Sequence, residues 1–240
     1  MIPPVIHYCW FGRKPLPKLA RKCMKSWKEF LPGFEIRLWN EDNFNVNAVP
    51  YTAEAYKAGK YAFVSDYARF AILYEHGGVY LDTDVQLIRP WEKLLTYAPF
   101  VGLEETGLIN PGLGLAFNPG NDFCRSMLDT YSRQHFINTD GTYNLSTVCD
   151  YATAYFLDKG FSAKAMPETI DGINILPPQV LSPKSQITGK INITKETYAI
   201  HHYAGSWLTP FERFKLRVKD FTGPAFARFY ITLKHKLTGA

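Results

Sequence analysis

The sequence is poor in cysteine, and its four cysteines form no C-x-x-C pair. This spacing excludes the common zinc-binding patterns and offers no disulfide framework, so we expect reduced core residues in a cytoplasmic protein. The four are Cys9, Cys23, Cys124 and Cys149. The N-terminus also lacks a basic and then apolar leader, and no apolar stretch approaches about 20 residues, so we expect neither a signal peptide nor a membrane-spanning helix. We find no internal repeat and no low-complexity linker.

The composition is that of a globular protein. A chain of 240 residues with 46% hydrophobic content fits one large α/β domain better than two small ones. The net charge of +5 favours anionic partners such as nucleotide diphosphates or acidic lipid surfaces, but it is too small to indicate nucleic-acid binding. Aromatic residues make up 15% of the chain and supply surfaces on which bases and sugars stack.

The chain is organised around residues 61–84, YAFVSDYARFAILYEHGGVYLDTD. Apolar residues at helical spacing predict an amphipathic helix, and Gly77 and Gly78 suit its C-terminus, where a positive φ is common. Asp66 falls close to the apolar face, where a carboxylate is costly to bury without a partner, and Arg69 lies within reach. The alternative is an exposed ion pair within the helix, worth only about 0.3–0.5 kcal/mol.

The glycines are followed by a predicted short strand that ends in Asp82-Thr83-Asp84. Two carboxylates two residues apart form a hard, anionic oxygen site, which suits Mg²⁺ or Mn²⁺ together with phosphate oxygens. An EF-hand beginning at Asp82 is excluded, because its sixth position is Leu87 rather than glycine and its twelfth is Lys93 rather than glutamate. A solvated turn is the alternative, since D-x-D alone is a common pattern.

The N-terminal region alternates strands and helices. A buried strand is predicted over residues 5–10, a helix over 16–30 and a half-buried strand over 34–39. This order indicates a mainly parallel sheet with right-handed crossovers. Because open sheets bind ligands at the carboxyl ends of their strands, Trp10 is a candidate for stacking on a nucleotide base, with a core tryptophan as the alternative. His7, inside the same strand, is expected to be structural.

The middle of the chain predicts further regular elements. They are strands over 85–88, 100–103 and 172–176 and helices over 122–131 and 144–157. Residues 110–117 are glycine-rich and then apolar, but they do not form a G-x-G-x-x-G that opens a helix, which excludes a dinucleotide fingerprint. Two interpretations stay open for this segment: a close approach of the backbone to a sugar, or a tight turn.

Two adjacent histidines lie near the C-terminus. A strand predicted over 198–200 is followed by His201 and His202, and imidazole nitrogen is a ligand that Mn²⁺ accepts. Alternation along a strand allows only one of them to face inward, and a lone histidine is usually structural. Residues 211–240 are basic and aromatic and predict an amphipathic helix, which either packs on the domain or lies on an anionic membrane surface.

Three segments together resemble the family 32 glycosyltransferases, which carry a DXD motif. This family includes capsular polysaccharide enzymes and yeast-type mannosyltransferases, and the clostridial glucosylating toxins are relatives. The stretch SDYARFAILYEHGGVYLDTD is similar to their S-D-x-x-R…G-G-x-Y-x-D-x-D signature, and HYCWFG resembles their H-x-x-W-x-G opening. HHYAGSW resembles their H-x-x-x-G-S-W type motif, which selects His201, and also the H-[FY]-x-G motif of glycogenin-like enzymes, which selects His202.

The resemblance implies a GT-A fold, with a Rossmann-like, mostly parallel sheet flanked by helices and a nucleotide-sugar donor at its carboxyl edge. The implied cofactor is Mn²⁺ or Mg²⁺ on the donor diphosphate, held by Asp82, Asp84 and either His201 or His202. The implied catalytic residues are Asp66, Arg69, Asp82 and Asp84. The implied donor-binding residues are Trp10, Ser65, Asp66, Arg69, Tyr80, Asp82, Ser206 and Trp207.

The activity that the resemblance implies is retaining transfer from a nucleotide-sugar, with UDP-sugar favoured, to a saccharide acceptor in capsular or extracellular polysaccharide synthesis. A lipid-linked acceptor would suit a C-terminal segment at the inner membrane face. We expect residues 1–209 to form the GT-A domain and residues 210–240 to form a helical segment packed on the domain or the membrane. The alternatives are a nucleotide-sugar hydrolase, a non-catalytic nucleotide- or sugar-binding scaffold, and a structural α/β domain.

Overall fold

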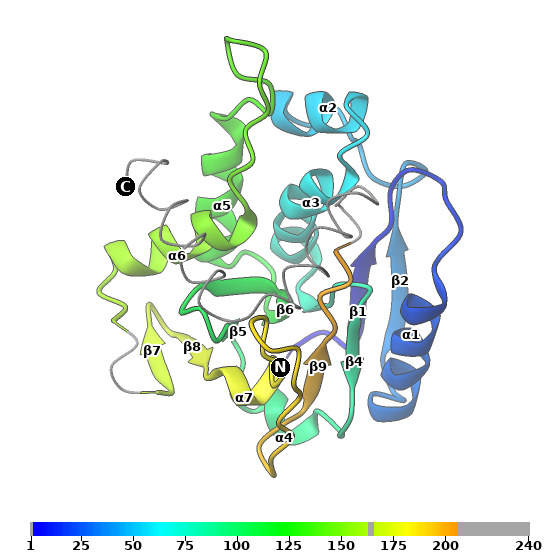
Figure 1. Cartoon of the computed structure of the whole chain (residues 1–240), viewed down its shortest axis with the longest axis vertical. Helices are drawn as coiled ribbons and strands as arrows, with labels where there is room; N and C mark the ends of the chain where they lie inside the picture. The colour runs from blue at the N-terminus through cyan, green and yellow to red at the C-terminus, as the bar shows by residue number, and fades with distance from the viewer. Residues whose placement is uncertain (1, 163–165, 206–240) are drawn as a thin grey trace.

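A mixed sheet of seven strands forms the centre of the protein in the computed structural model, which describes residues 2–162 and 166–205 (Figure 1). The strands are, in order across the sheet, β2 (Glu35–Trp39), β1 (Val5–Cys9), β3 (Gly78–Tyr80), β6 (Ile109–Phe117), β5 (Phe100–Leu103), β8 (Ile173–Leu176) and β7 (Glu168–Ile170). β1 pairs in parallel with β2 and β3, and β5 pairs in parallel with β8, whereas β6 and β7 run antiparallel to their neighbours. Five of the seven strands therefore run in one direction, which confirms the mostly parallel sheet.

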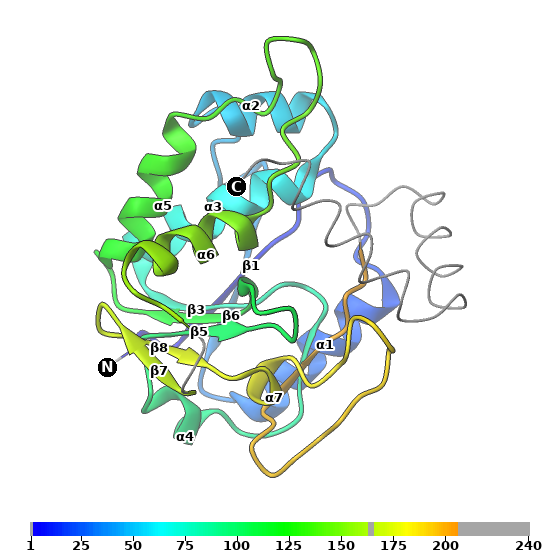
Figure 2. The ribbon, with the colours of Figure 1, turned by 60° about the vertical axis from the view of Figure 1, so that its left-hand side comes forward.

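Helices cover both faces of this sheet (Figures 1 and 2). One face packs against α2 (Pro50–Lys57), α3 (Tyr61–His76), α5 (Asp122–Ser132) and α6 (Val148–Asp158). The other face packs against α1 (Lys18–Phe30), α4 (Glu92–Leu95), α7 (Pro178–Leu181) and a small antiparallel sheet of β4 (Val85–Leu87) and β9 (Ala199–His201). The protein is therefore a three-layer α/β structure with one hydrophobic core on each side of the sheet.

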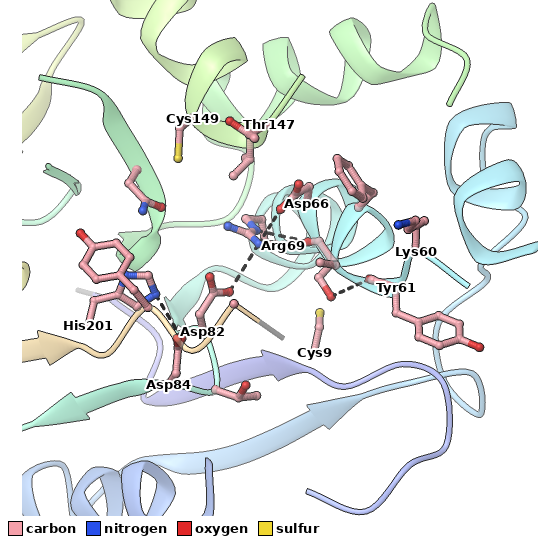
Figure 3. A pocket seen from close by; sticks show the side chains of 18 of the residues that line it. Cys9, Lys60, Tyr61, Asp66, Arg69, Asp82, Asp84, Thr147, Cys149 and His201 are labelled. Atoms are coloured by element: carbon pink, nitrogen blue, oxygen red, sulfur yellow. Dashed lines mark hydrogen bonds and ion pairs between the residues drawn. The ribbon is translucent and has the colours of Figure 1, made fainter. Parts of the chain in front are cut away.

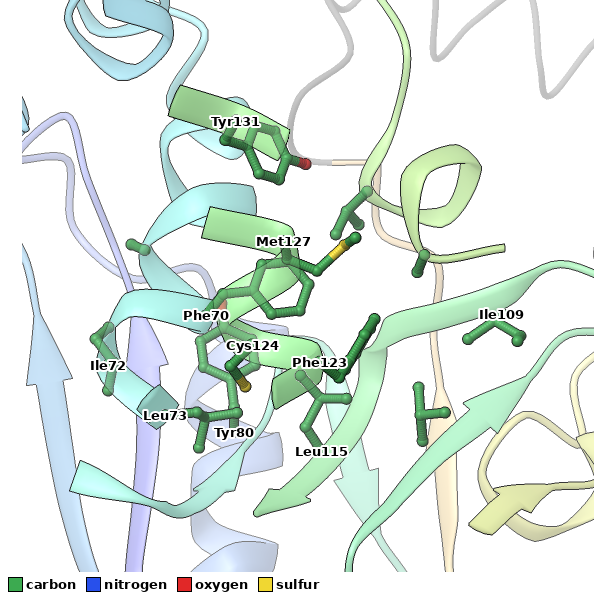
Figure 4. Packing of buried hydrophobic residues seen from close by; sticks show 14 of the residues in the cluster. Phe70, Ile72, Leu73, Tyr80, Ile109, Leu115, Phe123, Cys124, Met127 and Tyr131 are labelled. Carbon is green, nitrogen blue, oxygen red and sulfur yellow. The ribbon is translucent and has the colours of Figure 1, made fainter. Parts of the chain in front are cut away.

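Strand alternation divides side chains between the two cores. Val79 and Leu81 pack on the α1 side, whereas Tyr80 packs on the α3 side, as the sequence pattern predicts. On the α3 side, the rings of Phe70 from α3 and Phe123 from α5 meet edge to face, 5.5 Å apart (Figure 4). This aromatic packing fixes α3 against its neighbour and, with it, the side chains that α3 carries toward the edge of the sheet.

The two glycines after α3 direct the chain straight into β3. Gly77 and Gly78 have φ values of +63° and +98°, which confirms the predicted C-terminus of the helix. A Cβ atom at Gly77 would lie 2.5 Å from Cδ of Pro119, so the position requires glycine for space as well as for conformation. The helix and the D-x-D segment are thereby held at opposite ends of a three-residue strand.

Two predictions for the middle of the chain need correction. The tight turn considered for residues 110–117 is wrong, because all of them lie in the buried strand β6. The helix predicted from residue 144 begins at Val148, because Thr147 caps it. The backbone N–H of Thr147 donates to Oδ2 of Asp150 at 2.7 Å, and Oγ1 of Thr147 accepts from the backbone N–H of Asp150 at 3.4 Å.

The four cysteines are free thiols, three of them buried and Cys149 partly buried, as expected from their spacing. His7 is also buried, and both of its ring nitrogens are hydrogen-bonded within the core, which fits a structural role. Within residues 2–162 and 166–205, no helix has the length and hydropathy needed to cross a bilayer. The segment predicted over 210–240 lies outside the described residues.

Candidate active site

Helix α3 brings Asp66 and Arg69 together in the interior of the protein (Figure 3). Nη2 of Arg69 donates to Oδ1 of Asp66 at 2.8 Å, and Nε donates to the carbonyl oxygen of Ser65 at 3.2 Å. The arginine side chain is 3% exposed and the aspartate side chain 12%. The exposed helical ion pair is therefore wrong as an account of these residues, because two buried charges depend on each other for stability.

The same guanidinium group reaches a second carboxylate beyond the end of β3. Nη2 of Arg69 lies 3.4 Å from Oδ1 of Asp82, and the guanidinium lies over the ring of Tyr80, 5.0 Å from its centroid. Nη1 of Arg69 is buried and has no hydrogen-bond partner among the described residues. Arg69 thus joins α3 to the D-x-D segment and keeps one unused donor in the wall of the site.

The other aspartate of the motif pairs with a histidine from β9. Oδ1 of Asp84 lies 3.1 Å from Nε2 of His201, and Oδ2 accepts from the backbone N–H of Ala204 at 2.7 Å. His202 points away from this group and places its Nε2 3.0 Å from Oε1 of Gln86. Of the two histidines proposed as metal ligands, the structure therefore brings only His201 to the aspartates, and the placement of His202 in the site is wrong.

The carboxylates differ in how strongly they hold a proton. Burial raises the pKa of Asp66 to about 6 against the opposing effect of Arg69, and burial likewise raises the pKa of Asp82. Burial would also raise the pKa of Asp84, but the imidazole of His201 outweighs it and lowers this pKa overall. Burial lowers the pKa of His201, and the charge of Asp84 more than reverses that effect. Asp84 is thus the carboxylate most firmly held as an anion.

These groups line one cavity of about 590 Å³. Lys60 and Tyr61 lie at one end of it, and His201 and Cys149 lie at the other, with Asp66, Arg69 and Asp82 between them (Figure 3). The loop after β1 belongs to the Tyr61 end, because a Cβ atom at Gly12 would touch the ring of Tyr61. The cavity therefore carries lysines and aromatic rings at one end and carboxylates with an imidazole toward the other.

The remaining predicted donor-binding residues divide into two groups. Trp10, Ser65 and Tyr80 all line the cavity. Trp10 is partly buried at the carboxyl end of β1, and its Nε1 donates to the carbonyl oxygen of Lys14 at 2.6 Å. Ser206 and Trp207 lie outside the described residues. The roles of all these residues in donor binding stay predictions.

Sequence reasoning missed Glu104 and treated Asn110 only as part of a glycine-rich segment. Both are 6% exposed and line the cavity, and Nδ2 of Asn110 donates to Oε1 of Glu104. Glu104 lies near enough to His201 and Tyr203 to affect their pKa values. The available signal was the position of Glu104, directly after the buried strand β5, since polar residues at strand ends often face a ligand.

Asp82, Asp84 and His201 are the residues that could hold a metal ion. Each of the three residues offers one potential ligand atom, and these atoms all lie within 4.8 Å of one another. Two carboxylate oxygens and one imidazole nitrogen suit a divalent cation such as Mn²⁺, which accepts both kinds of ligand. Nδ1 of His201 is buried without a hydrogen-bond partner in the described chain. The residues present therefore fit a divalent cation.

Comparison with known proteins points to the part of the chain that contains Asp66, Arg69, Asp82 and Asp84. Residues 17–101 match the family described as "Glycosyltransferase sugar-binding region containing DXD motif". An uncharacterized glycosyltransferase of Acanthamoeba polyphaga mimivirus is 40% identical over 91 residues, which cover 35% of this chain and 36% of that protein. Inositol phosphoceramide mannosyltransferase 3 of Schizosaccharomyces pombe is 31% identical over 120 residues, which cover 48% of this chain and 33% of that protein. The chain thus spans about a third of the length of the curated relatives it matches.

Among solved structures, the PaToxG glycosyltransferase resembles the protein with a TM-score of 0.53 and 16% sequence identity, over 66% of this chain and 70% of that one. This likeness concerns the fold, and it confirms the GT-A class. Residues 17–101, which include Asp82-Thr83-Asp84, therefore match a glycosyltransferase family that carries a DXD motif. Its resemblance to the family 32 enzymes is confirmed, and DXD glycosyltransferases generally use a divalent metal.

Proposed function

We propose that the protein is a retaining glycosyltransferase that moves a sugar from a nucleotide-sugar to a saccharide acceptor. The observation that carries this proposal is the buried site in which Arg69 lies between Asp66 and Asp82 while Asp84 pairs with His201. Placing five ionisable groups in one cavity opposes folding, and such clusters with perturbed pKa values are typical of functional sites. The match to the DXD family supports the same activity.

Donor recognition is proposed to extend along the cavity from Trp10 to Arg69. Trp10 offers an aromatic face for a base, and Lys14 and Lys60 supply positive charge that suits a diphosphate. Asp66 accepts hydrogen bonds from sugar hydroxyls, and the unused Nη1 of Arg69 donates to a sugar or phosphate oxygen. The resemblance to toxins and capsule enzymes favours UDP-sugar, whereas the resemblance to the mannosyl branch of the same family favours GDP-sugar, so a test has to include both.

Asp82, Asp84 and His201 are proposed to hold Mn²⁺ or Mg²⁺. When bound, the cation would neutralise negative charge that develops on the leaving diphosphate. Asp84 suits this role because its lowered pKa keeps it anionic across the physiological range. The carboxylate of Asp82 lies beside Arg69, which is proposed to bind the sugar with Asp66. It also lies beside the other two proposed cation ligands, Asp84 and His201.

We further propose a front-face route, in which the nucleoside diphosphate leaves and the acceptor hydroxyl attacks on the same face of the donor sugar. The leaving phosphate accepts the proton of the acceptor hydroxyl. Retaining glycosidases use a carboxylate nucleophile about 5–5.5 Å from a second carboxyl group. Here each described carboxylate that lines the cavity already has a hydrogen-bond or ion-pair partner. These carboxylates are Asp66, Asp82, Asp84, Glu104 and Asp150. A sugar adduct on any of them, detected by mass spectrometry after incubation with donor, would contradict this route.

Two alternatives use the same donor site. A nucleotide-sugar hydrolase would pass the sugar to water, and product analysis with and without a saccharide acceptor separates it from a transferase. A non-catalytic scaffold would bind the nucleotide without turnover. Capsular or extracellular polysaccharide synthesis is part of the proposal and rests on the family resemblance. Contact of residues 210–240 with the inner membrane face, and with it a lipid-linked acceptor, is also part of the proposal and rests on the basic and aromatic composition of that segment.

The test is release of nucleoside diphosphate from UDP- and GDP-sugars, together with calorimetric binding of UDP and GDP, each with Mn²⁺ or with chelator. We expect metal-dependent binding and release with one base. The rate of release should fall at least about 100-fold in Asp84→Asn, because the metal and its ligands act on charge that develops in the transition state, and the metal-dependent binding should weaken as well. Asp129→Asn is the matched control, because Asp129 is exposed on α5 and lies outside the cavity lining. Metal-independent binding that Asp84→Asn leaves unchanged would refute the proposal.

A further inference from the structure

Strand β6 passes so close to the D-x-D segment that a side chain at one of its positions would meet the carboxylate of Asp82. A Cβ atom at Gly112 would lie 2.2 Å from Oδ2 of Asp82 and 2.9 Å from Oδ1 of Asn110. The φ of Gly112 lies outside the left-handed region, so any residue could adopt its backbone conformation. Glycine at this position therefore leaves space that the carboxylate of Asp82 occupies, and any larger residue would force that carboxylate to move.

A buried hydrogen-bond chain fixes the backbone at this position. Oδ1 of Asn110 accepts from the N–H of Gly112 at 2.6 Å, and Nδ2 of Asn110 donates to Oε1 of Glu104. Oε2 of Glu104 accepts from Oγ1 of Thr106 at 3.1 Å. The amide of Asn110 can have only this orientation, because the reverse would place its oxygen against the carboxylate of Glu104. Glu104 thus holds Asn110, and Asn110 holds Gly112.

We propose that Glu104, Asn110 and Gly112 are positioning residues that set the direction of the Asp82 carboxylate. On one side of Asp82 lies Arg69, with 3.4 Å between Nη2 and Oδ1. On another side lie the remaining cation ligands, within 4.8 Å. β6 closes a third side and prevents the carboxylate from turning away from both. This positioning role adds to the proposed function. It depends on that function only where it is tested by the binding of Mn²⁺ and nucleotide.

Substitution of Gly112 by alanine adds a methyl group at this position and so tests the constraint on Asp82. Ordinary van der Waals contact with a Cβ atom begins near 3.4 Å, so the methyl of an alanine would displace Oδ2 of Asp82 by about 1.2 Å. The side chain of Asp82 is 29% exposed, which leaves it room to move without unfolding the protein. A 1 Å misplacement in an active site can lower activity by a factor on the order of 100.

The experiment is a double-mutant cycle of Gly112→Ala and Asp82→Ala in the full chain, read as affinity for Mn²⁺ with UDP or GDP. Gly112→Ala is expected to weaken binding about 10-fold or more, and to add nothing once Asp82→Ala has removed the carboxylate. Gly33→Ala is the matched control, because nothing lies within 4 Å of a Cβ atom there. Unchanged binding in Gly112→Ala, or effects of the two substitutions that simply multiply, would overturn the proposal.

Two substitutions at Glu104 distinguish positioning from direct contact with substrate. Glu104→Gln keeps an oxygen that accepts from Asn110, so binding is expected to stay within about threefold of the wild type. Glu104→Ala leaves Asn110 without its acceptor and is expected to approach the loss seen in Gly112→Ala. If Glu104→Gln is as damaging as Glu104→Ala, the charge of Glu104 itself is needed and the positioning role is wrong.

Crystal structures of the wild type and Gly112→Ala decide the geometry independently of activity. We expect the Asp82 carboxylate to be displaced from Arg69 in the variant, and a carboxylate that stays in place would overturn the proposal. If the wild type binds neither Mn²⁺ nor nucleotide, the proposed function fails while this comparison still decides the positioning. If Gly112→Ala does not fold, Asp82→Ala should restore folding by removing the closer of the two clashes, and failure to restore it counts against the proposal.

Discussion

His7 should make the protein less stable as the pH falls from about 6.5 to about 4. Nε1 of Trp39 can only donate, so Nδ1 of His7 accepts this hydrogen bond at 3.0 Å. Nε2 then carries the proton and donates to the carbonyl oxygen of Gly77 at 3.0 Å. A second proton on Nδ1 would face the N–H of Trp39, so the folded protein favours the neutral imidazole.

The size of the effect follows from the pKa of His7 in the two states. Burial lowers this pKa from 6.5 to about 4, and the hydrogen bond to Gly77 opposes it only in part. Above pH 6.5 the imidazole is neutral in both states, and its contribution to stability is fully present. Between the two pKa values the unfolded chain binds a proton that the folded chain does not, so stability falls as the pH falls. The total loss is roughly 3 kcal/mol, at 1.36 kcal/mol for each tenfold change in proton affinity.

The assay is urea unfolding of the wild type and His7→Gln between pH 7.5 and pH 4. Glutamine keeps a neutral donor and acceptor, so the free energy of unfolding of the variant should gain roughly 3 kcal/mol relative to the wild type across this range. Other titrating groups cancel in the difference, including Asp66, whose pKa burial raises to about 6. A difference that is constant with pH, or an NMR titration of His7 with a midpoint near 6.5 in the folded protein, would refute the reasoning.

Two further predictions concern single positions. Gly77→Ala should lower the free energy of unfolding by at least about 1–3 kcal/mol, because the residue has φ +63° and its Cβ would meet Pro119 at 2.5 Å. The free energy of unfolding of Gly33→Ala should stay within about 0.5 kcal/mol of the wild type. Equal losses of stability in the two variants, measured by chemical denaturation, would count against this account. Thr147→Ala should cost about 1 kcal/mol by removing the cap that accepts from Asp150, with an unchanged melting temperature as the contrary result.

The parts of the fold and site that the sequence predicted are those with a local cause. Helical periodicity, two glycines that end the helix and strand alternation are all contained in residues 61–84. They placed Asp66 close to the apolar face of a helix, Arg69 within its reach and Asp82 at the end of a strand, without knowledge of the rest of the chain. The family resemblance added which of these residues share one site.

The parts that could not be predicted depend on pairing between distant segments. Alternation allowed either His201 or His202 to face inward, and the choice was made by β9, which pairs antiparallel with β4 and places His201 opposite Val85. The role of β6 was hidden for the same reason. Gly112 looks like a turn residue in sequence, and its steric requirement arises only because Asp82 arrives from another strand.

The two aspartates of the D-x-D segment depend on different layers of the protein. Asp82 follows β3 and is held by Arg69 from α3, on one face of the sheet. Asp84 precedes β4 and is held by His201 and by the backbone N–H of Ala204, 120 residues further along the chain. The α1 layer fixes β4 in turn. Nε1 of Trp27 donates to the carbonyl oxygen of Val85 at 2.7 Å, and Oγ of Ser26 accepts from the N–H of Leu87 at 2.9 Å.

A single turn at Thr83 therefore joins two halves of the site. The half built on α3 holds Asp82 and is proposed to grip the sugar, and the half built on α1, β4 and β9 supplies the other two proposed cation ligands, Asp84 and His201. Neither layer alone brings the two carboxylates together, because each anchors only one of them. The single residue between the aspartates thus links a carboxylate held from one face of the sheet to a carboxylate held from the other. This arrangement explains why the motif lies where the chain passes from β3 on the central sheet to β4 on the other face.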